Sequence, residues 1–346
     1  MGSEGAPDRV LVVGAGLAGL ICAHRLQTHG IDVTVLEKGR GPGGRQSTRR
    51  ETLGEHDLTF DHGAQYFTVR DPEFARFLAP FREGDEPVVR TWDTSIVSIE
   101  SGTIRARSEN TERYVCQPGM NGLARALAEP VRTLYSTRVH TCRREDDTWI
   151  LVDEEDAELA RGAALVITAP AAQALALLPD EAPLRNRLRA MRYAPCWTVM
   201  VHFPRSLEQD YGGAFVDRSP LSWIADNDSK PGRNPDGAPG ESWVLHGSPE
   251  WSYAHLEDTP EDVADALLVA LSEAIGHELP TPDLVRAHRW RYALPTMSAE
   301  EPCLWDEDWQ LAVAGDGCPA GARVEGAFLS GWTAARRIRL DREDVA

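Results

Sequence analysis

Residues 9–19 read RVLVVGAGLAG, a short apolar run that leads into three glycines with the spacing G-x-G-x-x-G. An apolar run bounded by glycine is typical of a buried strand in a parallel sheet. Gly30 suits the end of a following helix, and residues 32–36 (DVTVL) suit a second strand. The apolar residues between them recur at helical spacing, at Leu17, Leu20, Ile21 and Leu26. The order strand, helix, strand predicts a parallel crossover unit.

The three glycines predict a dinucleotide-binding site. Gly14 permits the tight turn, Gly16 lets the backbone approach a pyrophosphate, and Gly19 lets the helix pack on the strand. The start of that helix offers N–H groups and a positive dipole end to phosphate. Glu37 ends the second strand, where a carboxylate accepts hydrogen bonds from a ribose diol. Further candidate contacts in these two turns are Leu17, Ala18 and Lys38. The alternative is a tight strand–helix turn that binds no ligand.

A second glycine turn favours FAD over NAD. Residues 40–45 (RGPGGR) follow Glu37 almost directly. Gly43, Gly44 and Arg45 would place N–H donors and a cation beside the same pyrophosphate. Plain NAD dehydrogenases do not need this turn. The alternative is a flexible surface loop.

The C-terminal part of the chain supplies candidate flavin contacts. Residues 311–316 (LAVAGD) predict a buried strand that ends in Gly315 and Asp316. A strand-terminal acid can bond a ribityl hydroxyl, although Asp316 alone would be a plain turn residue. A helix that begins at Val324 can stabilise negative charge on a reduced flavin. Cys318 is interpreted as a packed thiol and not as a covalent flavin attachment.

Length and charge limit the function. A chain of 346 residues predicts roughly two domains. Its 36 basic and 54 acidic residues give a net charge of −18, and such a surface repels polyanions. Nucleic-acid binding is therefore not expected.

Cysteine usage and hydropathy indicate a reduced, cytoplasmic protein. The six cysteines form no C-x-x-C pair, and no Cys/His cluster has metal-ligand spacing, so no metal is expected. Met1–Asp8 is short and polar, unlike a signal peptide. The longest apolar stretch, Gly162–Pro179, is broken by Pro170 and Gln173 and predicts a strand followed by a helix. No contact with a membrane is expected.

The middle of the chain predicts a second sheet that is largely antiparallel. Its strands are expected over residues 88–107, 191–203 and 211–225, whereas residues 164–168 predict another buried strand that a helix follows. A hairpin is expected over 138–152 with its polar turn at 143–147. Helices are expected over 74–81, 123–128, 261–275 and 324–338. Residues 228–241 (DSKPGRNPDGAPGE) are rich in Pro and Gly and predict a mobile lid or a disordered excursion.

These features together resemble the FAD-dependent amine oxidase superfamily over nearly the whole chain, and within it the bacterial renalases. The matching stretches are DHGAQYFT (61–68), QPGM (117–120), SWIA (222–225), NDSKP (227–231), AHRWRY (287–292) and RVEGA (323–327). The resemblance implies an α/β fold in which two domains are interleaved. One is a Rossmann-type FAD-binding domain of residues 1–72, 112–178 and 295–346. The other is a substrate domain of residues 73–111 and 179–294, built on a mixed, mostly antiparallel sheet plus helices.

The resemblance also implies non-covalent FAD and an oxidase activity. The 2- and 6-dihydro isomers of NAD(P), which are misreduced forms, would be converted to NAD(P)⁺ while dioxygen becomes hydrogen peroxide. The partners would be this small dihydronicotinamide dinucleotide and dioxygen. Two alternatives stay open: an amine oxidase or desaturase acting on a small organic substrate, and a flavin-binding sensor without turnover.

By the same resemblance, Val139 places its backbone against the adenine, and Gln65 and Arg323 lie near the flavin. The positions expected around the substrate ring are Tyr66, Asn227, His246 and Trp290, of which Tyr66 also borders the flavin. Each has a structural alternative. Tyr66 and Trp290 could be core aromatics, His246 a satisfied strand histidine, and Asn227 a turn cap.

The implied chemistry needs no strong base, because a dihydropyridine gives up hydride directly. The protein has to hold the ring flat on the flavin in a dry pocket. Amine oxidases often keep a lysine and two aromatic residues at the flavin. Neither is evident here, because Lys230 falls in the Pro/Gly loop and Lys38 at the phosphate end.

Overall fold

The computed structural model describes residues 8–107, 111–234, 237–318 and 323–343. The chain divides into two compact, discontinuous units. The first unit comprises residues 1–44, 124–192 and 295–346, and the second comprises residues 45–123 and 193–294. Some residues discussed in the sequence analysis lie outside the described ranges. They are residues 1–7 of the polar N-terminal segment, residues 235–236 of the 228–241 loop, and residues 344–346 at the C-terminal end.

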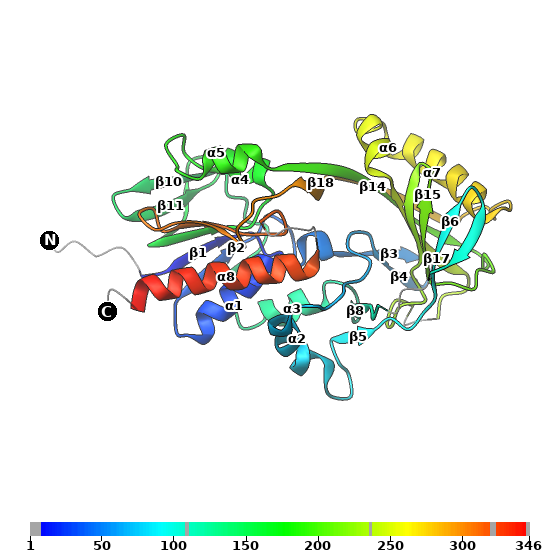
Figure 1. Ribbon diagram of the computed structural model, residues 1–346, viewed down its shortest axis with the longest axis horizontal. Coiled ribbons are helices and arrows are strands. Elements are labelled where there is room, and N and C mark those ends of the chain that lie inside the picture. The colour runs from blue at the N-terminus through cyan, green and yellow to red at the C-terminus, as the bar shows by residue number, and fades with distance from the viewer. Residues whose placement is uncertain (1–7, 108–110, 235–236, 319–322, 344–346) are drawn as a thin grey trace. The chain divides into compact units, whose positions relative to one another are not determined.

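The first unit is built on a six-stranded sheet in the order β19-β20-β13-β1-β2-β9. Figure 1 labels two of its central strands, β1 and β2. β1 (Val10–Val13) pairs in parallel with β2 (Val33–Leu36) on one side and with β13 (Ala164–Ile167) on the other. Every residue of these three strands is buried, as their apolar runs predicted. The outer strands are β19 (Leu304–Asp306), β20 (Leu311–Val313) and β9 (Thr133–Leu134).

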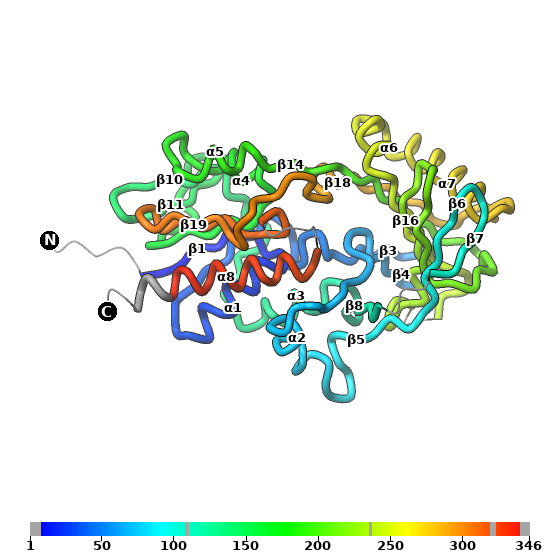
Figure 2. Tube along the Cα trace, viewed as in Figure 1, coloured from blue at the N-terminus to red at the C-terminus, as the bar shows by residue number. Residues whose placement is uncertain are grey.

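Two helices from distant parts of the chain, α1 (Leu17–Thr28) and α8 (Val324–Glu343), lie side by side in the first unit (Figure 2). A Cβ at Gly331 would come within 2.1 Å of the carbonyl oxygen of Ala18, so this close approach requires glycine. The unit also contains a three-stranded sheet and two short helices. These are β10 (Thr141–Glu145), β11 (Thr148–Val152), β12 (Glu158–Gly162), α4 (Ala171–Leu177) and α5 (Arg185–Ala190).

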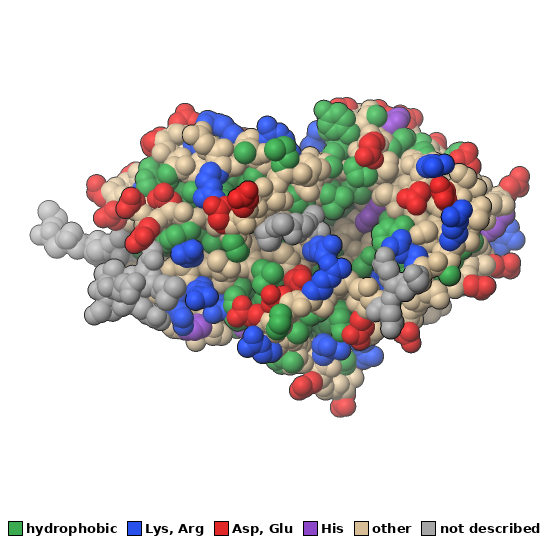
Figure 3. All heavy atoms as spheres, in the orientation of Figure 1, with side chains coloured by type: hydrophobic (Ala, Val, Ile, Leu, Met, Phe, Trp, Pro, Cys, Tyr) green, Lys and Arg blue, Asp and Glu red, His purple; other side chains and the backbone are tan. Residues whose placement is uncertain are grey.

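The long apolar stretch 162–179 forms β13 and α4, as expected. Within the described residues, no helix combines the length and the apolar character that crossing a membrane requires. On the face shown in Figure 3, basic side chains are interspersed with acidic ones. The predicted hairpin turn is shorter than expected: β10 continues to Glu145, and only Asp146 and Asp147 remain in the turn.

The second unit is built on a seven-stranded mixed sheet in the order β18-β14-β17-β16-β15-β6-β7. β6 pairs with β15 in parallel, whereas the pairs β6–β7, β15–β16, β16–β17 and β14–β17 are antiparallel. The strands are β18 (Leu284–Met297), β14 (Arg192–Phe203), β17 (Glu241–Gly247), β16 (Leu221–Asp226), β15 (Gly213–Asp217), β6 (Ile96–Glu100) and β7 (Thr103–Ala106). This mixed sheet in the second unit, together with the Rossmann-type sheet of the first, confirms the predicted fold class.

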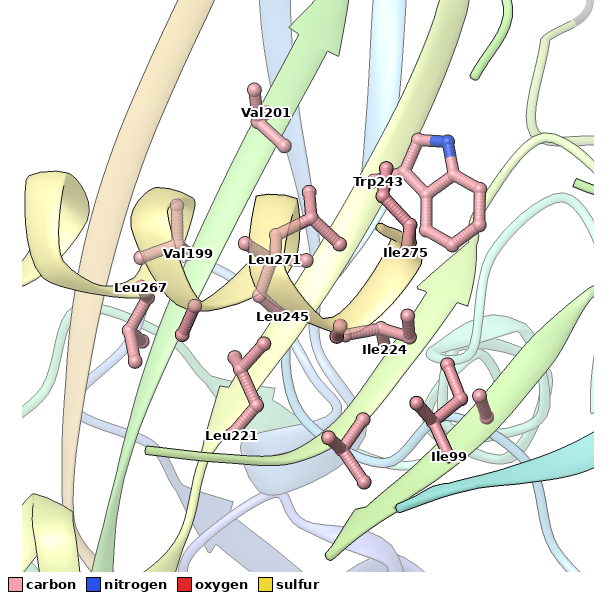
Figure 4. Packing of buried hydrophobic residues seen from close by; sticks show 14 of the residues in the cluster. Ile99, Val199, Val201, Leu221, Ile224, Trp243, Leu245, Leu267, Leu271 and Ile275 are labelled. Carbon is pink, nitrogen blue, oxygen red and sulfur yellow. The ribbon is translucent and has the colours of Figure 1, made fainter. Parts of the chain in front are cut away.

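One face of the seven-stranded sheet is covered by α7 (Pro260–Ile275). The side chain of Thr259 caps the helix, and Gly276 ends it in the left-handed region with φ +78°. Figure 4 shows Leu267 and Leu271 of α7 among the apolar side chains of the sheet. Because side chains alternate between the two faces of a strand, the polar and aromatic residues between these core positions lie on the opposite face.

The remaining elements of the second unit are short. They are β3 (Thr48–Leu53), β4 (His56–Asp61), β5 (Val89–Thr91), β8 (Tyr114–Cys116), α2 (Pro72–Leu78), α6 (Pro249–Ala254) and the 3-10 turn η2 (Ala79–Arg82). The 3-10 turn η1 (Gly44–Gln46) and α3 (Gly122–Ala128) cross the division of the chain.

The unit boundaries differ from the sequence-based ones at three segments. Residues 45–72 and 112–123 belong to the second unit and residues 179–192 to the first. The β3–β4 hairpin stays with the second unit because Phe60 packs in one core cluster with Met200 of β14. α5 stays with the first because Arg185 donates a 2.6 Å hydrogen bond to the carbonyl oxygen of Leu178.

Candidate active site

The glycine turn after β1 has the geometry that its sequence predicted. Gly14 has φ +108°, and a Cβ there would lie 2.6 Å from Oγ1 of Thr168. At Gly19 a Cβ would lie 2.1 Å from the carbonyl oxygen of Gly14. At Gly16 a Cβ would meet no heavy atom within 4 Å. The turn therefore has no room for a side chain at Gly14 or Gly19, whereas the space beside Gly16 is open to a ligand.

The start of α1 suits an anion. Gly16 is the N-terminal cap of the helix, and no side chain caps it. The first N–H groups of a helix carry a partial positive charge and need an acceptor. A pyrophosphate supplies such an acceptor, so the turn fits the dinucleotide that the sequence predicts.

Glu37 joins the two glycine turns. Its Oε2 accepts a hydrogen bond from the N–H of Ala15 at 2.7 Å, and its Oε1 accepts one from the N–H of Gly39 at 2.6 Å. A carboxylate has about four acceptor positions, so two backbone bonds leave capacity for ribose hydroxyls. The ribose contact stays a prediction, as does any role for Lys38, which is exposed.

The second glycine turn lies against the first. The N–H of Gly43 donates to the carbonyl oxygen of Ala15 at 2.9 Å, and Gly16 and Gly43 form a parallel bridge. A Cβ at Gly44 would lie 3.3 Å from the Cα of Gly16. The segment is thus packed on the phosphate turn and is not a flexible surface loop.

Arg45 contacts the backbone of β18. Its Nη1 donates to the carbonyl oxygens of Tyr292 and Ala293 in β18, at 3.4 Å and 3.2 Å. Its guanidinium also lies 5.8 Å from the ring centroid of Tyr193. These contacts are all within the second unit, and the expected place of Arg45 beside the pyrophosphate stays a prediction.

The C-terminal candidates lie in the first unit. The N–H of Gly315, which has φ +150°, donates to Oγ of Ser330 in α8 at 2.8 Å. Asp316 follows directly and is half-buried. α8 begins at Val324, after the exposed Arg323. The remaining candidate, Val139, is buried between β9 and β10.

Cys318 is a packed thiol. It is buried, and its Sγ donates to the carbonyl oxygen of Val313 at 3.4 Å. Burial raises the pKa of this thiol to about 11. A protonated thiol is a poor nucleophile, which agrees with flavin held without a covalent bond.

In the second unit, a buried ion network lies at the end of β4. The side chains of Asp61, Lys230 and Arg233 are fully buried. Arg233 donates to Oδ2 of Asp61 through Nε at 3.0 Å and Nη2 at 2.7 Å. Nζ of Lys230 lies 3.4 Å from the same oxygen. Burial alone would raise the pKa of Asp61, but the charges of Arg233 and Lys230 lower it below its usual value. Burial lowers the pKa of Lys230 to about 8.

This network corrects two expectations about residues 228–241. The part up to Asn234 is anchored through Lys230 and Arg233, so it is neither a mobile lid nor a disordered excursion. Lys230 also does not lie on the surface of a loop. Its Nζ donates to Oε1 of Gln65 at 3.0 Å, and Gln65 is a predicted flavin neighbour.

Lys230 fixes the orientation of the Gln65 amide. An ammonium group only donates, so the amide oxygen of Gln65 has to face it. Nε2 of Gln65 then donates to the backbone carbonyls of Asp61 and of Gly63, the latter at 3.1 Å. The same Nε2 lies 3.4 Å from Nε2 of His246. Both amide hydrogens of Gln65 already have backbone acceptors, so this contact does not by itself select a tautomer of His246.

His246 belongs to a row of side chains that crosses the sheet. The row runs across four adjacent strands, and each of its residues lies directly opposite the next one on the neighbouring strand. Its members are Ser98 of β6, Phe215 of β15, Trp223 of β16 and His246 of β17. Their neighbours along each strand belong to the core under α7, so this row lies on the opposite face. The rings of Phe215 and Trp223 are 4.8 Å apart. The indole N–H of Trp223 is buried and has no hydrogen-bond partner within the described part of the chain.

Tyr66 and Trp92 lie against this row. The ring of Tyr66 is 5.5 Å from that of Trp223 and 6.1 Å from that of Trp92. Nζ of Lys230 lies 5.4 Å from the Trp92 ring centroid. The structure thus brings Gln65, Tyr66 and His246 together, and adds two aromatic residues that the prediction did not place around the ring.

The other two predicted substrate residues behave differently. Trp290 stacks on His62, with ring centroids 5.1 Å apart, and donates from Nε1 to the carbonyl oxygen of His62 at 2.8 Å. Asn227 is fully buried. Its Oδ1 accepts from the N–H of Asp61 at 3.1 Å, and its Nδ2 donates to the carbonyl oxygen of Thr59 at 2.7 Å. Asn227 therefore holds β4 in place, so neither the substrate contact nor the turn cap describes it.

The imidazole of His246 is neutral at physiological pH. Burial lowers its pKa to about 3, and the charge of Lys230 adds to this effect. Burial also lowers the pKa of His62, to about 4. These rings can donate or accept hydrogen bonds, but neither carries a positive charge near pH 7.

The sequence matches the family model "Flavin containing amine oxidoreductase" over residues 91–339, which is most of the chain. The chain belongs to this family. Residues 12–81 match a model for NAD(P)-binding Rossmann-like domains, which is the segment that holds both glycine turns. The family implies FAD as the cofactor, and the geometry at Gly14, Gly16 and Gly19 fits such a dinucleotide.

Solved structures share the fold of this amine oxidoreductase chain at low identity. Cyclohexylamine oxidase from Brevibacterium oxydans IH-35A aligns with a TM-score of 0.76 at 13% identity, covering 97% of this chain and 100% of the other. A candidate protoporphyrinogen oxidase from Exiguobacterium sp. 255-15 aligns with a TM-score of 0.75 at 14% identity, covering 99% and 100%. At these identities the likeness concerns the fold alone.

Sequence matches to curated relatives of the family are short. Protoporphyrinogen oxidase 2 of Arabidopsis thaliana is 37% identical over 70 residues, which is 20% of this chain and 13% of that protein. The alignment therefore spans about an eighth of the relative's length.

The residues that sequence reasoning missed are Asp61, Arg233 and Trp92. Asp61 and Lys230 are separated by 169 positions, so no local spacing could connect them. One signal was present: Lys230 is one of only two lysines in the chain, and it lies in a stretch otherwise poor in apolar residues. Within the described residues, no group of three or more His, Cys, Asp or Glu side chains could hold a metal ion.

Proposed function

We propose that this protein is an FAD-dependent oxidase that converts the 2- and 6-dihydro isomers of NAD(P) to NAD(P)⁺, with dioxygen reduced to hydrogen peroxide. The observation that carries the proposal is the row formed by Phe215, Trp223 and His246, with Gln65 and Tyr66 lying against it. Aromatic faces suit a flat ring, and an oriented amide with a neutral imidazole suits a carboxamide.

The side chains of this site match a reaction that moves hydride and needs no base. FAD, when bound, supplies the acceptor for two electrons and a hydrogen nucleus, and it hands them on to dioxygen. The overall balance is one dihydropyridine, one dioxygen and one proton giving one pyridinium and one hydrogen peroxide. His246 is too weak a base for proton abstraction because its pKa is about 3. Lys230 is committed to Asp61 and Gln65. The residues of the chain then contribute by positioning the dihydropyridine ring on the flavin and by excluding water from the site.

A second candidate is oxidation of a small amine. Tyr66, Trp92 and Trp223 form an aromatic group of the kind that can enclose an alkyl amine. Within the described chain, the one buried lysine beside this group is already paired with a carboxylate. An amine has to lose a proton before hydride transfer, and the neutral, weakly basic imidazoles suit that step poorly.

The experiment is anaerobic bleaching of the bound flavin. The yellow holoprotein is mixed with borohydride-reduced NAD⁺, which contains the dihydro isomers, with pure 4-dihydro NADH, and with a panel of primary amines. Rapid loss of flavin absorbance with the isomer mixture alone is expected. Bleaching by an amine alone would establish the second candidate. No bleaching by any donor would indicate a flavin-binding sensor.

A further inference from the structure

Two arginines lie close to the aromatic side chains of this face: Arg107 at the end of the row formed by Ser98 and Phe215, and Arg113 beside Tyr66. Nη1 of Arg107 donates to Oγ of Ser98 at 3.0 Å, and its guanidinium lies 4.5 Å from the ring centroid of Phe215. The guanidinium of Arg113 lies 5.3 Å from the ring centroid of Tyr66. Arg107 therefore contacts the row itself, and Arg113 contacts Tyr66, which lies against it.

The same two arginines line a cavity of about 510 Å³ in the second unit. Thr94, Ser95 and Tyr211 contribute hydroxyl groups to its lining. Tyr211 is only 6% exposed, and its hydroxyl has no hydrogen-bond partner within the described part of the chain. A buried hydroxyl without a partner costs free energy, which a polar ligand would recover. The lining also includes two exposed carboxylates, Glu208 and Asp210.

We propose that this cavity binds the phosphate groups of a dinucleotide substrate whose nicotinamide ring lies near His246. The inference rests on the proposed function. Guanidinium groups bind phosphate oxygens in pairs, and hydroxyls complete such sites. A chain with a net charge of −18 repels an anionic substrate unless cations are gathered locally.

The spacing of the row supports this assignment. Phe215 and His246 are two strands apart, which corresponds to roughly 10 Å. That span leaves room for a ribose between the ring and the phosphate. An amine ligand would be repelled by Arg107 and Arg113, so the cavity does not suit the second candidate function.

The test compares two substrates with and without phosphate, in variants that remove one charge each. Arg107→Gln and Arg113→Gln are assayed with the dihydro isomers of NAD and with those of nicotinamide riboside. Arg218→Gln is the matched control, because the Arg218 side chain is 78% exposed and outside the cavity. Thermal unfolding verifies that each variant is folded.

In the wild type, KM for the dinucleotide is expected to be lower than KM for the riboside. Each cavity variant should reduce this advantage by about 10- to 100-fold, the usual effect of losing a charged hydrogen bond, while the control keeps it. An unchanged ratio of the two KM values in both variants would overturn the proposal.

A second measurement separates this inference from the proposed function. Titration calorimetry measures binding of ADP-ribose, which lacks the nicotinamide ring, to the FAD-loaded protein. Binding that weakens in both cavity variants supports the phosphate subsite even if no dihydro isomer bleaches the flavin. Absence of ADP-ribose binding to the wild type would overturn the subsite whatever the flavin does.

Discussion

Replacing Lys230 by methionine is expected to change the site while leaving the stability of the fold nearly unchanged. Methionine fills similar space but brings no charge and no donor. Asp61 keeps its two hydrogen bonds from Arg233, and Gln65 loses the donor to its Oε1.

The magnitude follows from two opposing terms. The pKa of Lys230 falls from 10.5 to about 8 in the folded state. At about 1.4 kcal/mol per pKa unit, the folded protein disfavours the charged form by about 3 kcal/mol at neutral pH. Leaving the buried oxygen of Gln65 without a donor costs about 1–3 kcal/mol. We therefore expect the free energy of unfolding at pH 7 to change by less than about 2 kcal/mol.

The pH dependence gives a sharper test. Between pH 8 and 10.5 the unfolded lysine is protonated while the folded one is not. The unfolded state then binds more protons, so this group adds stability as the pH rises through that window. The difference in unfolding free energy between wild type and Lys230→Met, measured with urea from pH 7 to 10, should grow in favour of the wild type by up to about 3 kcal/mol.

Lys230→Met should change the surroundings of Gln65 and His246 even though it leaves the free energy of unfolding at pH 7 nearly unchanged. Without Lys230, Oε1 of Gln65 loses its donor, and His246 loses a nearby positive charge that lowers its pKa. Nitrogen-15 NMR of the histidine rings, assigned with His246→Asn, should show a higher pKa for His246 in the variant than in the wild type, because that charge is gone.

The matched variant is Arg233→Met, which removes the other cation from Asp61. It breaks two short hydrogen bonds to a fully buried carboxylate and should cost about 3–5 kcal/mol. Equal losses in the two variants, together with a flat pH difference for Lys230→Met, would refute the reasoning.

Three further outcomes are expected. Gly19→Ala should abolish FAD retention on gel filtration, because its Cβ would meet the carbonyl oxygen of Gly14 at 2.1 Å, whereas Gly41→Ala, with nothing within 4 Å, should retain the cofactor. Glu37→Ala should lower flavin occupancy, since it removes the acceptor for two backbone N–H groups and for the expected ribose; a wild-type flavin-to-protein absorbance ratio would contradict this. All six cysteines are buried and have raised pKa values, so the folded chain keeps protons that the unfolded chain loses above about pH 8.5. Between pH 7.5 and 9.5 the cysteines should lower the free energy of unfolding by about 8 kcal/mol, whereas Lys230 should raise it by about 2 kcal/mol. Urea titrations under reducing conditions should therefore show a net fall of about 6 kcal/mol between the two pH values, and a much smaller fall would contradict the prediction.

The cofactor domain could be predicted because its signals are local. The run that ends at Gly14 and the glycines after it carry the strand, the turn and the helix within about twenty residues. The steric limit at Gly19 comes from the backbone of the same turn, so the residue type alone indicates the geometry there. The limit at Gly14 comes from the side chain of Thr168, directly after β13.

The substrate side could not be predicted in the same way. Asn227 was expected to touch substrate, yet its partners are backbone atoms of β4, 166 and 168 positions away. The loop of residues 228–241 has a composition typical of mobile segments, but two cations in it meet one buried carboxylate. A long-range ion pair of this kind leaves no periodic pattern in the sequence. The strand that contains Trp223 does leave one, because its side chains alternate between the two faces of the sheet with a period of two residues.

The packing of α8 on α1 has a consequence for how the protein is made. α1 leaves the ribosome well before the helix that covers it and before the strand β20 of the same sheet, because both follow it by nearly 300 residues. The nucleotide-binding half therefore keeps an apolar helix face uncovered until α8 has been synthesised. FAD loading has to follow the synthesis of α8, and a chain that stops before α8 is expected to be held by chaperones or degraded instead of accumulating as an apoprotein.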